Sequence, residues 1–63
     1  MTSFEHLHQK YKRLLITKKE AAEELLISTA SFDRLRKSGQ IKTKRVGGSV
    51  YVSIKDLSSY IDA

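Results

Sequence analysis

The sequence predicts one small α+β domain, mostly helical, with a β-hairpin near its C-terminal end. The chain has only 63 residues, which leaves room for a few short elements around one modest core. Apolar side chains recur at helical spacing behind Ser or Thr residues that can cap a helix. Gly47-Gly48 separates two β-favouring runs, which is typical of a two-residue hairpin turn.

Residues 1–13 form an N-terminal segment that predicts a short amphipathic helix over residues 3–12. Thr2 and Glu5 have the spacing of a capping box. Apolar side chains then follow at roughly helical intervals. They are Phe4, Leu7 and Tyr11. These side chains should give the helix one apolar face.

Residues 14–63 form the main segment, which opens with an apolar run at 14–16 that predicts a short strand. Thr17 and Glu20 form a second and better capping box, because each side chain can bond the amide of the other residue. This box introduces a helix predicted over residues 18–26, whose small alanine side chains allow a second helix to approach closely.

A second helix is predicted over residues 29–37, after a turn of two or three residues. Ser28 is a suitable N-cap, and Phe32 and Leu35 lie about one turn apart on the side expected to be buried. Gly39 can end the helix in a left-handed conformation. Two helices joined by so short a turn predict a helix-turn-helix.

The hairpin strands are predicted over residues 42–46 and 49–53. Ser53 can cap a last helix over residues 54–62, in which Leu57, Tyr60 and Ile61 should pack inward. A hairpin beside the second helix of a helix-turn-helix can act as a wing. The expected architecture is therefore a winged helix-turn-helix with an extra N-terminal helix.

The charge of the chain favours a polyanionic partner. Twelve basic residues face seven acidic ones, for a net charge of +5. Between residues 34 and 55 there are seven basic residues and no acidic one. They are Arg34, Arg36, Lys37, Lys42, Lys44, Arg45 and Lys55. A basic run alone is usually a solvated face, but this one covers the two elements that a winged helix places on DNA.

Several other functions are not expected. The chain has no cysteine, which excludes a disulfide or a thiolate zinc site. His6 and His8 lie on different sides of a helix, so they do not predict a metal site. No catalytic constellation, cofactor motif, small-molecule pocket, signal peptide or membrane-spanning run is apparent, and the default compartment is the cytoplasm.

Short motifs in a fixed order carry a family resemblance over about three quarters of the chain. They read Leu14-Leu15-Ile16-Thr17, Glu20-Ala21-Ala22, Ile27-Ser28, Arg34-Leu35, Ser38-Gly39-Gln40-Ile41, Arg45-Val46-Gly47-Gly48, Asp56-Leu57 and Tyr60-Ile61. Together they resemble the excisionase-type helix-turn-helix family, small winged-helix domains related to the MerR DNA-binding domain. The resemblance implies a nucleoid-associated accessory factor of a bacterial or phage mobile element. Such a factor is either an excisionase that bends DNA and assists an integrase, or a small transcription regulator.

The chain departs from the family pattern at four positions. Leu26 stands where the turn between the helices usually has Gly, so it must avoid the left-handed conformation or carry strain. Lys42 replaces a frequent Pro, and Arg36 occupies a common apolar position. Ser49 stands where the wing usually has Arg or Lys, which leaves the wing tip poor in charge.

Ten residues are expected to contact duplex DNA. They are Lys18, Lys19, Ser28, Thr29, Arg34, Lys37, Lys42, Lys44, Arg45 and Ser49. Arg34 is the best candidate for a base contact, and a bidentate bond to guanine would give about 1–3 kcal/mol of discrimination. The alternative for Arg34 is a salt bridge to Asp33 or a nearby glutamate. Asp33 itself would either orient Arg34 or Arg36, or accept a hydrogen bond from cytosine.

An adaptor role is the competing hypothesis. The face formed by Phe4, Leu7 and Tyr11 would in the simplest case cover the core of the domain. It could instead dock a larger protein of the same element, such as an integrase, helicase or polymerase. The basic surface would then add general affinity for duplex or single-stranded DNA.

Overall fold

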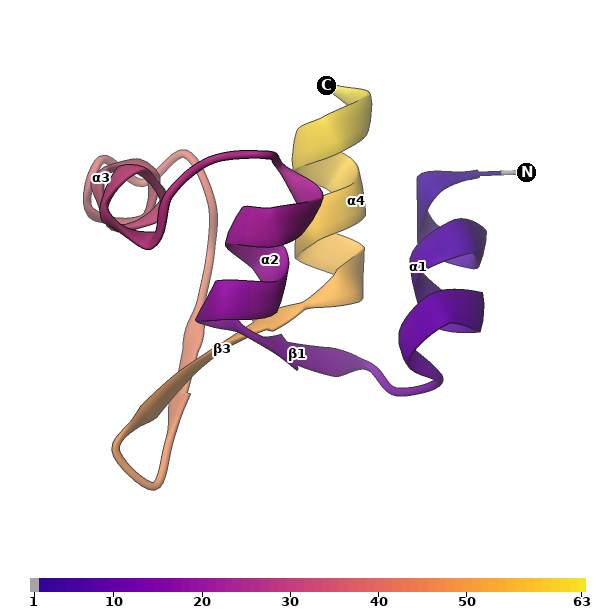
Figure 1. Cartoon of the computed structure of the whole chain (residues 1–63), viewed down its shortest axis with the longest axis horizontal. Helices are drawn as coiled ribbons and strands as arrows, with labels where there is room; N and C mark the ends of the chain where they lie inside the picture. The colour runs from indigo at the N-terminus through magenta and orange to yellow at the C-terminus, as the bar shows by residue number, and fades with distance from the viewer. Residues whose placement is uncertain (1) are drawn as a thin grey trace.

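The structure is a computed structural model that describes residues 2–63. Figure 1 shows helices arranged around one small antiparallel sheet. In chain order the elements are α1 (Ser3–Tyr11), β1 (Leu15–Thr17), α2 (Lys18–Glu24), α3 (Thr29–Lys37), β2 (Lys44–Val46), β3 (Ser49–Ser53) and α4 (Ile54–Asp62). The predicted α+β class is confirmed, and every expected element lies within two residues of its predicted bounds. Within residues 2–63, no helix has the length and apolar character needed to cross a membrane.

Hydroxyl caps determine where most helices begin. The Thr17 hydroxyl accepts a hydrogen bond from the Glu20 amide at 3.0 Å, and the Glu20 carboxylate accepts one from the Thr17 amide at 2.9 Å. Ser28 caps α3 and Ser53 caps α4 through the same kind of bond. Each hydroxyl satisfies an amide that the helix start would leave unpaired, so α2, α3 and α4 begin where the sequence predicts.

The sheet joins the two ends of the main segment, because β3 lies between β1 and β2. Ile16 of β1 pairs with Val52 of β3, and both side chains are fully buried. The amide of Ile54 also donates to the Leu14 carbonyl at 2.9 Å. Side chains alternate along a strand, so one face of the sheet packs under the helices and the other is open.

One hydrophobic core connects all these elements except β2. Its buried members are Leu7, Ile16, Ala21, Ala22, Phe32, Ile41, Val52, Ile54 and Leu57. Phe32 anchors α3 in this core, and Leu7 does the same for α1. The expectation that Ile61 packs inward is wrong, because this side chain lies in the last turn of α4, at the edge of the core, and is 42% exposed.

The end of α2 comes two residues earlier than predicted, because Leu26 adopts the left-handed conformation with φ 60°. The Leu26 amide donates to the Glu23 carbonyl, and the Ile27 amide donates to the Ala22 carbonyl. This is a Schellman motif, and α3 ends in the same motif around Gly39 at φ 82°. Leu26 therefore occupies a glycine position, and its side chain is 92% exposed.

Replacing Leu26 by glycine should stabilise the protein. Leu26→Gly removes the left-handed strain of a side chain that contributes almost no burial, and we expect a gain of about 0.5–1 kcal/mol after the added chain entropy. Leu26→Ala keeps the strain and is the matched control. Urea denaturation measures both variants, and equal stability of the two would contradict the assignment of strain.

Two leucines near the start of the chain should differ sharply in their effect on stability. Leu7 is 2% exposed and Leu14 is 63% exposed. We expect Leu7→Ala to lower the free energy of unfolding by about 2–5 kcal/mol, because it leaves a cavity in the core. Leu14→Ala should change it by about 0.5 kcal/mol or less. Comparable losses in urea denaturation would contradict the position of α1.

Candidate nucleic-acid interface

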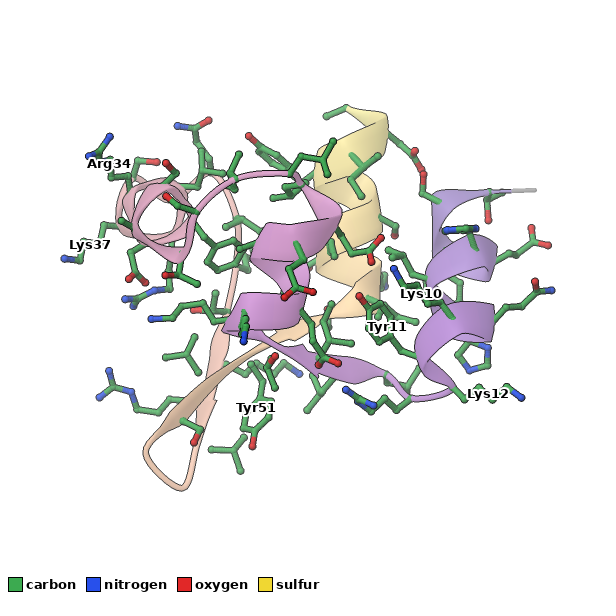
Figure 2. The ribbon with its side chains drawn as sticks, in the orientation of Figure 1. Lys10, Tyr11, Lys12, Arg34, Lys37 and Tyr51 are labelled. Atoms are coloured by element: carbon green, nitrogen blue, oxygen red, sulfur yellow. The ribbon has the colours of Figure 1, made fainter. Side chains whose placement is uncertain are left out.

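The outer side of α3 presents polar and basic side chains to solvent. Phe32 is buried and Leu35 is half-buried, so this edge of the helix faces the core. Arg34 and Lys37 are exposed and point away from the body of the domain, as Figure 2 shows. Arg34 has no ion-pair partner among residues 2–63, so the salt bridge considered as its alternative role is not formed.

The residues expected to contact DNA are largely accessible. Nine of the ten are exposed, and Lys18 is half-buried. They belong to the start of α2, to α3 with its cap Ser28, to the loop after α3, and to the β2–β3 hairpin. In Figure 1, α3 and the hairpin lie on the same side of the molecule, at the left, whereas α1 lies at the opposite side.

The hairpin divides two neighbouring cations between its faces. Lys44 pairs with Tyr51, and Arg45 pairs with Val50, two residues from the buried Val52. Because side chains alternate along a strand, Arg45 lies on the face that the helices cover. Lys44 lies on the open face, as does Ser49, the partner of Val46. Of the two cations, only Arg45 therefore lies on the core side of the sheet, where α3 contributes Phe32 to the core.

Asp33 joins α2 and α3 through two cations. The Lys18 Nζ lies 3.2 and 3.3 Å from the two carboxylate oxygens, and the Arg36 Nη2 lies 3.1 Å from Oδ1. The bonds from Arg36, with those from Lys18, hold the pKa of Asp33 below its usual value. The expected contact of Asp33 with Arg34 or Arg36 is formed with Arg36, and acceptance from cytosine stays a prediction.

The expected docking face of α1 is built into the fold. Leu7 is buried in the core, in agreement with the simplest case expected for this face, in which it covers the core of the domain. The Tyr11 hydroxyl donates to Glu24 at 2.6 Å, and Lys10 pairs with the same carboxylate. Burial and the contact with Glu24 raise the pKa of Tyr11 above its usual range, so the hydroxyl remains a donor. Phe4 is the exposed remainder of the face.

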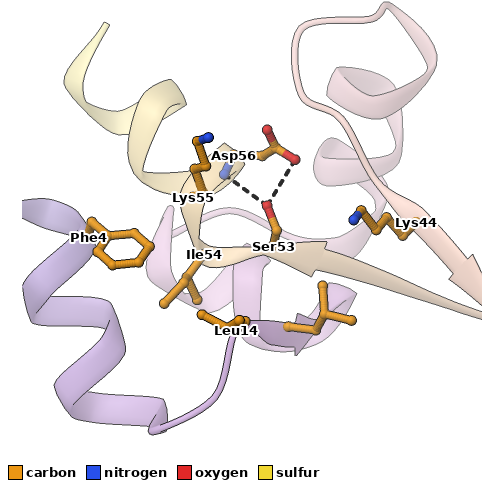
Figure 3. A pocket seen from close by; sticks show the side chains of 8 residues that line it. Phe4, Leu14, Lys44, Ser53, Ile54, Lys55 and Asp56 are labelled. Carbon is orange, nitrogen blue, oxygen red and sulfur yellow. Dashed lines mark hydrogen bonds between the residues drawn. The ribbon is translucent and has the colours of Figure 1, made fainter.

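Phe4 lines a groove of about 590 Å³ at the junction of α1, β1 and α4. In Figure 3, Leu14 and Ile54 form its apolar floor beside Phe4, and the Lys44 side chain lies across the groove. The Ser53 hydroxyl and Asp56 at its wall are bonded to each other in the cap of α4. Lys44, expected to reach DNA, is thus part of this groove.

The ion pair between Asp33 and Arg36 has the i,i+3 spacing that is usual for ion pairs on a helix. The contact of Arg13 was not predicted from the sequence. Arg13 bonds both oxygens of Glu20 at 2.6 and 2.7 Å, which places it in the α2 capping box. In the part of the chain that the structure describes, no cluster of His, Asp and Glu could hold a metal ion.

Comparisons with known protein families, with curated proteins and with solved structures found no match to this chain. The charge, the exposure and the arrangement of the elements are therefore the observations from which a function can be argued.

Glu20 should make stability depend on acid pH. The bond from the Thr17 amide, with the Arg13 guanidinium, holds the pKa of Glu20 below its usual value. Its contribution is therefore complete above the unfolded-state pKa of about 4.3 and is lost as pH falls through the lower folded-state value. At pH 7, Glu20→Gln should cost about 1 kcal/mol.

The cost of Glu20→Gln should shrink below about pH 4, because the Glu20 carboxylate of the wild type then becomes protonated and neutral like the Gln side chain. Urea denaturation at several pH values measures it. Glu23→Gln removes one charge from an exposed position of the same helix and is the control. A cost of Glu20→Gln that is the same at pH 7 and pH 3 would contradict the role of the carboxylate.

Proposed function

We propose that this chain is a winged helix-turn-helix protein that binds duplex DNA. In this proposal α3 enters the major groove and the β2–β3 hairpin is the wing. The protein serves a bacterial or phage mobile element as an excisionase-like accessory factor or a small transcription regulator, as the resemblance of residues 14–61 implies. It acts without catalysis.

The observation that carries the proposal is the placement of the acid-free basic stretch. Residues 34–55 contain seven basic side chains and no acidic one. Five of the seven, Arg34, Arg36, Lys37, Lys44 and Arg45, belong to α3 and the hairpin. These two elements lie on one side of the domain, and α1 lies at the other. A helix-turn-helix uses its second helix for base edges and neighbouring elements for phosphates.

Each part of α3 has a role in this proposal. Arg34 reads a base edge, since it is exposed and outside every ion pair of the described residues. Lys37 contacts phosphate. The amides of the first turn, next to Ser28 and Thr29, favour an anion at the helix start. Arg45 adds a phosphate contact from the wing.

The adaptor hypothesis has less support. Two of the three residues expected to dock a larger protein lie inside the fold, Leu7 in the core and Tyr11 against Glu24. DNA binding is therefore the function that the side-chain positions favour.

The test is a salt titration of binding to a labelled duplex of random sequence, followed by fluorescence anisotropy. With about four to six phosphate contacts, the logarithm of the association constant should fall against the logarithm of salt concentration with a slope of about −4 to −5. No binding, or affinity that does not change with salt, would contradict the proposal.

Two variants of the hairpin sharpen this experiment. Arg45→Ala should weaken binding and make the salt slope shallower by about one. Lys44→Ala removes the same charge one residue away on the open face and should have a smaller effect. Equal losses for Arg45→Ala and Lys44→Ala would overturn the assignment of the two hairpin faces.

Arg34→Ala should reduce the difference in affinity between duplexes of different sequence.

A further inference from the structure

One carboxylate lies within the surface proposed for DNA. Asp33 is the single acidic residue of α3, and it accepts hydrogen bonds from Lys18 at the first position of α2 and from Arg36 one turn later on α3. The three side chains are between 26% and 34% exposed. They are therefore reachable from solvent, and an external anion can compete for the two cations.

A DNA phosphate would meet Asp33 as a competitor. Phosphate and carboxylate oxygens accept hydrogen bonds from the same lysine and guanidinium groups. A phosphate that binds Lys18 and Arg36 must displace the Asp33 carboxylate and then lie next to its negative charge. Exposed ion pairs are weak, so the displacement is possible, but it reduces the gain from both contacts.

We infer that Asp33 is a specificity-determining residue, which lowers the affinity for duplex DNA of any sequence by occupying Lys18 and Arg36. This inference rests on the proposed DNA binding. Arg34 and Lys37 are then the cations of α3 that are free before DNA arrives. Binding therefore depends more on Arg34, which is expected to read a base. The opposite arrangement, in which Asp33 orients the two cations toward phosphates, predicts the opposite effect of its removal.

The test compares Asp33→Asn with Glu23→Gln, which removes the same charge from an exposed position of α2. Both are titrated against a random-sequence duplex over a range of salt concentrations. At 0.1 M salt, one or two added phosphate contacts should make Asp33→Asn bind about tenfold tighter than Glu23→Gln and steepen its salt slope by about 1–2. Equal or weaker binding by Asp33→Asn would overturn the inference.

A double-mutant cycle identifies the cations involved. Lys18→Ala should cost more affinity in the Asp33→Asn background than in the wild type, because only there is Lys18 free to bind phosphate. Equal costs would overturn the role assigned to Lys18. Asp33→Ala is the second variant if Asp33→Asn does not fold.

Failure of the proposed function can be separated from failure of this inference. If the wild type binds no duplex, DNA binding is wrong, and elution from immobilised heparin then tests Asp33 alone. Elution of Asp33→Asn at higher salt than Glu23→Gln would still support restraint of the two cations. Elution at the same salt would overturn it.

Discussion

Ile16 and Val52 face each other across β1 and β3, and neither has any exposed surface. This contact joins the strand before α2 to the strand before α4, and because the pair is antiparallel, the two helices start at its opposite ends. Phe32 packs into the same core from α3. Residues 2–63 have no second core to hold these parts, as expected for so short a chain. The relative position of α3 and the hairpin therefore depends on this one contact region.

The sheet also decides which cations can act together. A strand sends successive side chains to opposite faces, so Lys44 and Arg45 lie on different faces although they are neighbours in sequence. Lys44 lies beside the apolar groove near Phe4 and Leu14. A basic stretch in sequence is thus divided by the fold into a part near α3 and a part on the open face.

Ion pairing divides the charge further. Lys10 of α1 pairs with Glu24 of α2, and Arg13 of the loop after α1 pairs with Glu20 of α2. Lys18 and Arg36 share Asp33 at the junction of α2 and α3. The net charge of +5 therefore describes the attraction of the whole chain for a polyanion, whereas local affinity depends on which cations have no carboxylate beside them.

The sequence by itself determined the helices and the hairpin, because the interactions that begin or close them are local. Thr17, Ser28 and Ser53 cap their helices through bonds within three residues, and Gly47-Gly48 closes its hairpin through its own backbone freedom, so these features need no distant partner. The tertiary structure alone decided that Leu7 is buried and that Lys18 meets Asp33. Each of these depends on contacts between residues that are far apart in the chain. Leu26 lies between the two cases. From the sequence, it either avoids the left-handed conformation or carries strain. The Schellman motif that joins α2 to α3 imposes the left-handed conformation.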